Sequence, residues 1–319
     1  MFVDPFRLLI ENSIEEIKKY LKHGNPDIID NTGKTLLHYA VIYDNFEVAL
    51  LLVNAKIVID KTDLNNNSAL HFAAQLGKIN FIKLLLKFKA NNYMLNDKGE
   101  IPLFLAVLKG NLEAVRLFFE EESDYQRKNR DEENILFYAV RSGSIPMISY
   151  ILEKTDLKTD TVNFRNDSLI HVSVKANMFD VTAYLIEQNA RTFKINNHLE
   201  TPLFYAVRNE NLEICQLLID NGALLENVNK ENEMVMNIHD DENPVFEYLQ
   251  KIINSYKYNH YWKSYPLHCY LKIENYDKIK VYLKEKNNYP EMDSFNVSVK
   301  ELINDSREDI KKLFNKDED

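Results

Sequence analysis

Four histidines recur at the same place in near-copies of one short motif, and imidazole is both a common metal ligand and a general base near neutral pH. The copies that carry them are TLLHYAV with His38, SALHFAA with His71, SLIHVSV with His171 and YPLHCYL with His268. Three further copies, IPLFLAV, NILFYAV and TPLFYAV, have phenylalanine there. A row of histidines of this kind could hold metal ions or transfer protons, so the pattern has to be tested against both roles.

Phenylalanine at the histidine position argues against catalysis, because a metal or catalytic site does not tolerate an apolar ring in its place. Packed helices also lie about 10 Å apart, so neighbouring copies cannot share one ion. The hydroxyl three residues before the histidine is mostly kept or lost with it: Thr35 precedes His38, whereas Ile101 precedes Phe104. We therefore interpret the histidines as structural.

Other reactive residues give no stronger signal. The acidic run from His239 to Glu242 is read as a solvated loop, since adjacent residues rarely converge on one ion. Cys215 and Cys269 are read as packing residues, and neither lies in a metal-type pair. Phosphate-binding and hydrolase motifs are missing from the sequence. The sequence predicts no enzyme, no cofactor and no small-molecule substrate.

The amino-acid composition disfavours some classes of binding partner. The formal net charge of −10 argues against bulk binding to nucleic acid or to an anionic membrane, because both require positive charge. No apolar run reaches 18 residues, and the first 22 residues show amphipathic spacing rather than a signal peptide. Two cysteines suit a reducing compartment. We expect a cytoplasmic protein, with delivery into a host cell left open.

The motif copies define a repeat that must position every side chain. Leu37, Leu70, Leu103, Leu136, Ile170 and Leu203 follow one another at intervals of 33, 33, 33, 34 and 33 residues. The motif is predicted to open one short helix, and runs such as NLEICQLLI show the apolar spacing of a second helix. Polar turn-forming segments such as NDKGE separate the units. Fixed spacing of this kind predicts a solenoid.

This pattern resembles the ankyrin repeat, with its unit of about 33 residues, its TPLHxA-like motif and its helix pair followed by a hairpin. The resemblance implies an all-α solenoid of helix-turn-helix units joined by β-hairpin loops, with about nine or ten units and at least one degenerate unit. Its parts are expected to be an N-terminal capping repeat at 1–29, six well-formed repeats at 30–229, a degenerate repeat at 230–260, and a further repeat with a C-terminal cap at 261–319. In this family, the motif histidine bonds the preceding hydroxyl and the backbone of the neighbouring hairpin.

The resemblance also implies a concave groove lined by the first helices and the hairpin tips. The expected groove residues, taken just after each motif, are Tyr43, Gln75, Lys109, Arg141, Lys175, Arg208 and Lys272. Five of these seven are basic, which predicts a positive stripe that reads an acidic segment of a partner protein. The alternative is that long cations simply complement the helix dipole at the end of each first helix.

At the hairpin tips, the predicted contact residues are Arg130, Phe164, Arg165, His198, Tyr261 and Trp262. Large apolar groups at turns call for a covering partner, although Trp262 could instead pack on the degenerate unit beside it. The sequence thus favours non-catalytic protein–protein binding by an adaptor, inhibitor or effector. The alternatives are an immunity- or antitoxin-like protein that covers an enzyme's active site and, less favoured, an enzyme whose activity lies in the C-terminal region.

Overall fold

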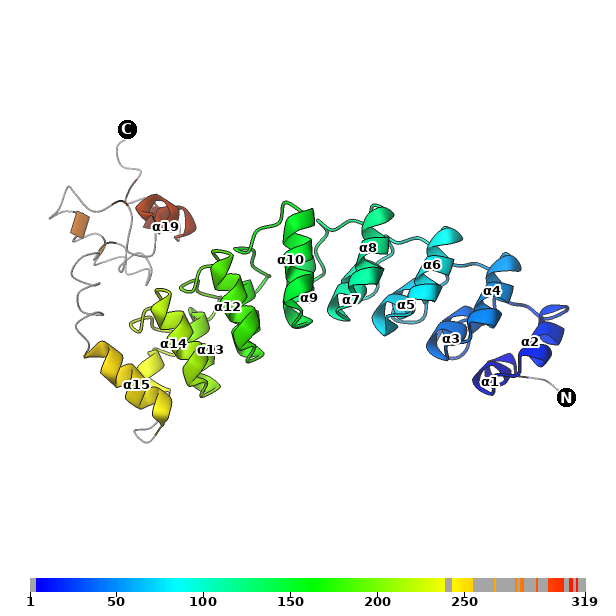
Figure 1. Ribbon diagram of the computed structural model, residues 1–319, viewed down its shortest axis with the longest axis horizontal. Coiled ribbons are helices and arrows are strands. Elements are labelled where there is room, and N and C mark those ends of the chain that lie inside the picture. The colour runs from blue at the N-terminus through cyan, green and yellow to red at the C-terminus, as the bar shows by residue number, and fades with distance from the viewer. Residues whose placement is uncertain are drawn as a thin grey trace. The chain divides into compact units, whose positions relative to one another are not determined.

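The computed structural model of the chain describes residues 4–238 and 243–254, and nearer the C-terminus 267, 279, 282–283, 291, 298–306, 310–311 and 314. Within these residues the elements are helices, joined by loops that carry isolated β-bridges (Figure 1). The chain divides into two compact units, residues 1–158 and 159–319. Each unit repeats the same pair of antiparallel helices, as the motif spacing predicts.

The first unit contains five helix pairs. Its first helices are α1 (Pro5–Ile10), α3 (Leu36–Ile42), α5 (Ala69–Leu76), α7 (Pro102–Leu108) and α9 (Ile135–Arg141). Its second helices are α2 (Ile14–Leu21), α4 (Phe46–Asn54), α6 (Ile79–Lys87), α8 (Leu112–Glu120) and α10 (Ile145–Lys154). First helices pack against first helices, from α1 to α9, and α2, α4, α6 and α8 pack in a second layer.

The second unit repeats the plan with α11 (Leu169–Lys175), α12 (Phe179–Glu187), α13 (Pro202–Arg208) and α14 (Leu212–Asp220). In the range 230–260, the first helix is only a 3₁₀ turn, η1 (Val235–Asn237), followed by α15 (Pro244–Ile253). Helix α19 (Val299–Asp305) contributes Val299 and Leu302 to an apolar cluster with Phe193, which lies in the loop after α12. The division of 261–319 into a further repeat and a cap stays a prediction.

The core lies between the two helix layers. The motif phenylalanines Phe104, Phe137 and Phe204 are completely buried. The small residue two positions on, such as Ala106 or Ala139, is buried as well and lets neighbouring helices approach closely. The motif therefore supplies both the filling and the spacing of each layer.

Many of the helices begin at a residue whose side chain caps them, although the first helices α7 and α13 have no such side-chain hydrogen bond. Thr35, Ser68 and Ser168 cap first helices and accept a hydrogen bond from the third backbone N–H of the helix. Asn45 and Asn111 do the same for second helices, with N···O distances of 3.1 Å. Such caps satisfy donors that the helix leaves unpaired, each stabilising by about 1 kcal/mol.

The hairpin loops share one construction. The first residue of each is Asp or Asn, and its Oδ1 accepts the backbone N–H groups two and four residues on, at 2.8–3.2 Å. These residues are Asp30, Asp63, Asn96, Asn129, Asn163 and Asn196. Backbone hydrogen bonds also join successive hairpins, as when Leu64 N–H donates to the Thr32 carbonyl at 2.9 Å. The loops are thereby held in fixed positions on the helix stack.

Candidate partner-binding surface

The histidines are part of this loop construction. Nδ1 of His171 accepts the backbone N–H of Ser168 at 3.1 Å and lies 2.8 Å from its hydroxyl, and Nε2 lies 2.9 Å from the Glu200 carbonyl of the next hairpin. His38 and His71 make the same contacts. The hydrogen-bonding role that the family resemblance implied is confirmed for these three, and His268 lies outside the described residues.

Burial fixes the charge state of these rings. It lowers the pKa of His38 and of His171 to about 4, and it lowers the pKa of His71 as well. The neutral ring then donates from Nε2 to the neighbouring carbonyl and accepts at Nδ1. A ring with both nitrogens occupied in this way connects one repeat to the next and has no free position for a metal.

The groove positions predicted from the sequence are solvent-exposed where the structure describes them. Tyr43, Gln75, Lys109, Arg141, Lys175 and Arg208 all lie on the surface at the C-terminal ends of first helices. Lys272 lies outside the described residues. These side chains occupy matching places on successive first helices within each unit, and their role in binding stays a prediction.

Three of the predicted cations do not carry free charge. Arg141 forms a two-pronged ion pair with Glu133, and Lys175 pairs with Asp167 at 2.7 Å. Arg208 pairs likewise with Glu200. Each acid is the last residue of the same repeat's hairpin, eight positions before the cation. The expected stripe of uncompensated positive charge is therefore wrong at these positions, because a buried carboxylate neutralises each cation.

The pairs also fix the shape of the surface. The side chain of Asp167 is 5% exposed and that of Lys175 is 32% exposed. Burial alone would raise the pKa of Asp167, but hydrogen bonds from Lys175 and Asn196 outweigh it, and the pKa is lowered. Lys175 Nζ also lies 4.3 Å from the centre of the Tyr205 ring. A cation held by both a carboxylate and a ring is ordered before any partner arrives.

At the hairpin tips the structure exposes both apolar and charged groups. Phe164 is 47% exposed with Arg165 stacked over its ring, and Arg130 and His198 are exposed too. Tyr261 and Trp262 lie outside the described residues. Leu64 belongs to the hairpin-tip positions expected from the sequence but was not singled out as a contact, and at 71% it is the most exposed large apolar residue in the described part of the chain.

Leu64 and Phe164 occupy the same position, the second residue of a hairpin. The sequence signal that singles out Leu64 among the tip residues is this equivalence, because every other described hairpin has a polar residue there. The sequence analysis also did not include the acid that lies eight residues before each cation. The same eight-residue interval recurs in three repeats, but only the folded hairpin brings the acid and the cation together.

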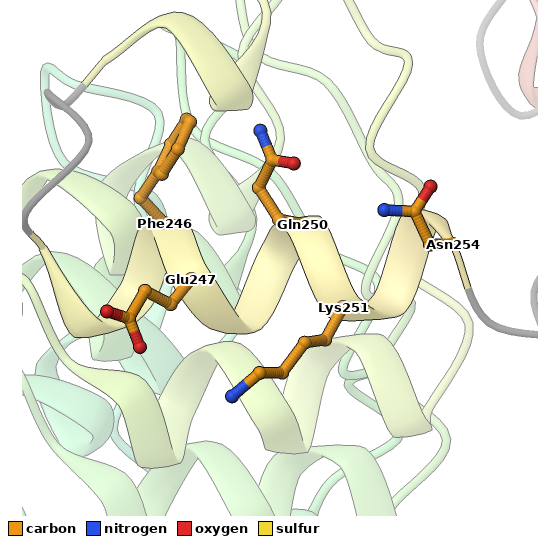
Figure 2. Close-up of a pocket in the computed structure, with 5 residues that line it drawn as sticks. All are labelled: Phe246, Glu247, Gln250, Lys251 and Asn254. Atoms are coloured by element: carbon orange, nitrogen blue, oxygen red, sulfur yellow. The ribbon is translucent and has the colours of Figure 1, made fainter.

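A separate cavity of about 460 Å³ lies along α15, lined by Phe246, Glu247, Gln250, Lys251 and Asn254 (Figure 2). Figure 2 shows these side chains spread along one exposed stretch of the helix. They are not brought together around a common point, and the candidate surface lies on the hairpins and first helices instead.

Reactive groups elsewhere are buried or dispersed. Cys215 is fully buried in α14, where burial raises the pKa of its thiol to about 12, so the thiolate is scarce at neutral pH. Groups of three or more potential metal-ligating side chains do not occur among the described residues. The predicted loop from His239 to Glu242 and Cys269 lie outside them. No described helix is long and apolar enough to cross a bilayer.

This arrangement of helix pairs, hairpins and bonded histidines defines an ankyrin repeat protein. The family model for ankyrin repeats matches the chain three times, over residues 6–97, 70–163 and 136–232. The chain belongs to the ankyrin repeat family. Ankyrin repeats are generally protein–protein interaction modules, and the family is typically non-enzymatic.

Several similar curated proteins are viral. Interferon antagonist OPG039 of monkeypox virus is 27% identical over 223 residues, which are 69% of this chain and 77% of that protein. Putative ankyrin repeat protein L371 of Acanthamoeba polyphaga mimivirus is 24% identical over 231 residues, 68% of this chain but only 30% of that protein. The chain therefore spans less than a third of the mimivirus relative.

Solved structures show the same fold. The ankyrin repeat domain of human ASB11 superposes with a TM-score of 0.62 at 22% identity, covering 68% of this chain and 97% of that domain. The ankyrin repeat domain of Bcl-3, a member of the IkappaB protein family, gives a TM-score of 0.55 at 21% identity. The match covers 68% of this chain and 98% of that domain. At this identity the likeness concerns the fold alone.

Proposed function

We propose that this chain is a non-catalytic binding protein that holds a partner protein against its hairpin tips and first-helix ends. The observation that carries the proposal is the exposure of Leu64 and Phe164 at the same hairpin position. Removal of large apolar side chains from water is favourable, and on an exposed turn it happens only when another surface covers them. They are the natural centres of an interface.

The hairpin backbone supports this role. Oδ1 of Asp63 accepts the backbone N–H groups of Asn65 and Asn67, and Oδ1 of Asn163 does the same for Arg165 and Asp167. A side chain presented from a fixed loop loses little further entropy on binding, so more of the contact energy appears as affinity. Because Arg141, Lys175 and Arg208 are paired internally, the proposal rests on these apolar tips and not on attraction of an acidic segment.

We further propose that binding antagonises the partner. The similarity to a poxvirus protein named an interferon antagonist supports this direction, and it favours action in the cytoplasm of a host cell. Occlusion of a functional surface requires no chemistry from the ankyrin chain. A protein that covers one enzyme's active site would bind that enzyme in a tight one-to-one complex and inhibit it, whereas an adaptor would leave its partner active.

Capture from a cell lysate tests the proposal. The full chain is immobilised, retained proteins are identified by mass spectrometry, and their affinity is measured with Leu64→Asp and Phe164→Asp variants. Leu50→Asp is the matched control, because Leu50 is 38% exposed on the second helix α4. We expect at least tenfold weaker binding by a tip variant and unchanged binding by the control. Equal binding by all three variants would contradict the proposal.

A further inference from the structure

One repeat has the acid but lacks the cation of the pattern that the three following repeats share. Glu100 occupies the hairpin position of Glu133, and it is equally removed from water, at 7% exposure. The residue eight positions on, where Glu133 has Arg141, is Leu108. Among the acids that the structure describes at this hairpin position, Glu100 is the one without an ion pair.

The Glu100 carboxylate keeps acceptor capacity. Oε2 accepts the amide of Asn96 at 2.8 Å, and Oε1 accepts the Tyr138 hydroxyl at 2.9 Å. A carboxylate offers about four acceptor sites, so neutral donors occupy half of them. A carboxylate this far out of water is stabilised fully only by a cation, which the three following repeats each supply from their own first helix.

Space for such a cation exists beside Glu100. A cavity of about 490 Å³ is lined by Glu100, Asn65, Gln75, Leu105 and Leu108, among others. Its apolar wall is formed by α7, and its polar wall comes from two successive hairpins. Lys98 and Lys109 also line it, but both are exposed, and neither forms an ion pair with Glu100 in this fully described part of the chain.

We propose that this cavity receives an arginine side chain of the partner protein, whose guanidinium pairs with Glu100. The chain itself shows the arrangement in the next repeat, where the Arg141 guanidinium contacts both oxygens of Glu133. The planar guanidinium matches a carboxylate with two parallel hydrogen bonds, and its alkyl stem can pack on Leu105 and Leu108. A lysine would make a single-point contact and fit this site less well.

This inference rests on the proposed function, since it names one contact within the proposed interface. It also gives Leu108 a role. Because Leu108 is apolar, the space beside Glu100 that corresponds to the Arg141 guanidinium in the next repeat stays unfilled. Leu108→Arg should fill this space with a side chain of the chain itself, which pairs with Glu100 and excludes the partner's arginine. Glu100→Gln removes the charge and keeps one acceptor oxygen, while its amide –NH2 takes the place of the other oxygen.

The test uses n-propylguanidinium as the probe, titrated into the full-length chain, with binding read from backbone amide NMR shifts of the Asn96–Glu100 hairpin. We expect saturable binding that weakens at least tenfold in both Glu100→Gln and Leu108→Arg. Asp131→Asn, which removes an exposed carboxylate of the next hairpin outside the cavity lining, should stay within twofold. n-Propylurea, which has a similar shape but no charge, should not bind. Circular dichroism of each variant checks that it folds.

Unchanged probe affinity in Glu100→Gln, or equal binding of n-propylurea, would overturn the inference. Tighter binding of n-butylammonium than of n-propylguanidinium would overturn the choice of arginine. The two proposals fail separately: if Leu64→Asp loses a captured partner while Glu100→Gln keeps both the partner and the probe, the binding function stands and the arginine site falls.

Discussion

The ammonium group of Lys175 donates to Oδ2 of Asp167 at 2.7 Å, joining the end of α11 to the last residue of the hairpin before it. Asp167 is almost completely buried, so this hydrogen bond compensates a charge that water cannot reach. The pair connects the surface of the repeat to its turn. The same connection recurs between Glu133 and Arg141 and between Glu200 and Arg208.

Removing the cation should therefore destabilise the fold. Lys175→Met keeps most of the apolar stem and leaves Asp167 buried without its charged partner, so we expect the free energy of unfolding to fall by about 2 kcal/mol. Urea unfolding measures the change. The double variant with Asp167→Asn should recover most of the loss, because it removes the charge that needed compensation. A double variant as unstable as the single one would contradict this account.

Protonation of Asp167 provides an independent check. Because its pKa is lowered on folding, the unfolded chain binds the proton more readily, and the stabilisation is present above the unfolded value of about 4. It is lost as the pH falls below that value and through the lower folded-state pKa. The destabilising effect of Lys175→Met should shrink over the same acidic range, as measured by urea unfolding at a series of pH values.

The fold was predictable because repetition makes its pattern visible seven times. The interval between Leu37 and Leu70 set the unit length, and the phenylalanine at position 104 separated packing from chemistry. The placement of the groove residues on first-helix ends followed from the same register. What the sequence could not show is pairing across an eight-residue separation, since the helix cap Asn134 and most of α9 lie between Glu133 and Arg141.

The charge of the surface illustrates this limit. Counting bases at one motif position predicted a positive stripe, but the acids that neutralise it belong to a different structural element. The sequence places Leu64 at a hairpin tip, but the extent of its exposure becomes known only from the folded hairpin. Both features depend on how hairpins sit on helices, which is tertiary geometry.

The buried histidines predict acid sensitivity. The folded-state pKa of His171 is about 4, against about 6.5 in the unfolded chain, so between these values the unfolded chain binds more protons. Stability is therefore lost as the pH falls from about 6.5 to 4. At about 1.4 kcal/mol for each pKa unit, one such histidine contributes about 3 kcal/mol over the full range.

A double variant isolates this contribution. Ser168→Asn with His171→Phe reproduces the combination that the chain already uses at Asn134 and Phe137. We expect a smaller loss of stability between pH 7 and pH 5 than in the parent chain, measured by urea unfolding at both values. Ser168→Asn alone retains the histidine and serves as the control. An unchanged pH dependence in the double variant would exclude His171 as the source.

One hairpin residue adopts a backbone conformation that its side chain disfavours. Leu199 has φ of 58°, at the hairpin position where Gly33 has 80° and Gly99 has 74°. A left-handed conformation costs a residue with a Cβ atom about 1 kcal/mol relative to glycine. Leu199→Gly should therefore raise the free energy of unfolding by about 1 kcal/mol, less whatever packing the partly exposed leucine provides.

The reverse substitution supplies the contrast. At Gly33 an added Cβ would lie 2.9 Å from the backbone nitrogen of Leu64, in the next hairpin, besides requiring the left-handed conformation. Gly33→Ala should therefore destabilise by more than 1 kcal/mol and disturb the hairpin that presents Leu64. Urea unfolding compares the two variants, with His198→Gly as a control for added flexibility at an exposed position without positive φ. If Leu199→Gly destabilises as much as His198→Gly, then the backbone at Leu199 is not strained, and its side chain contributes through packing.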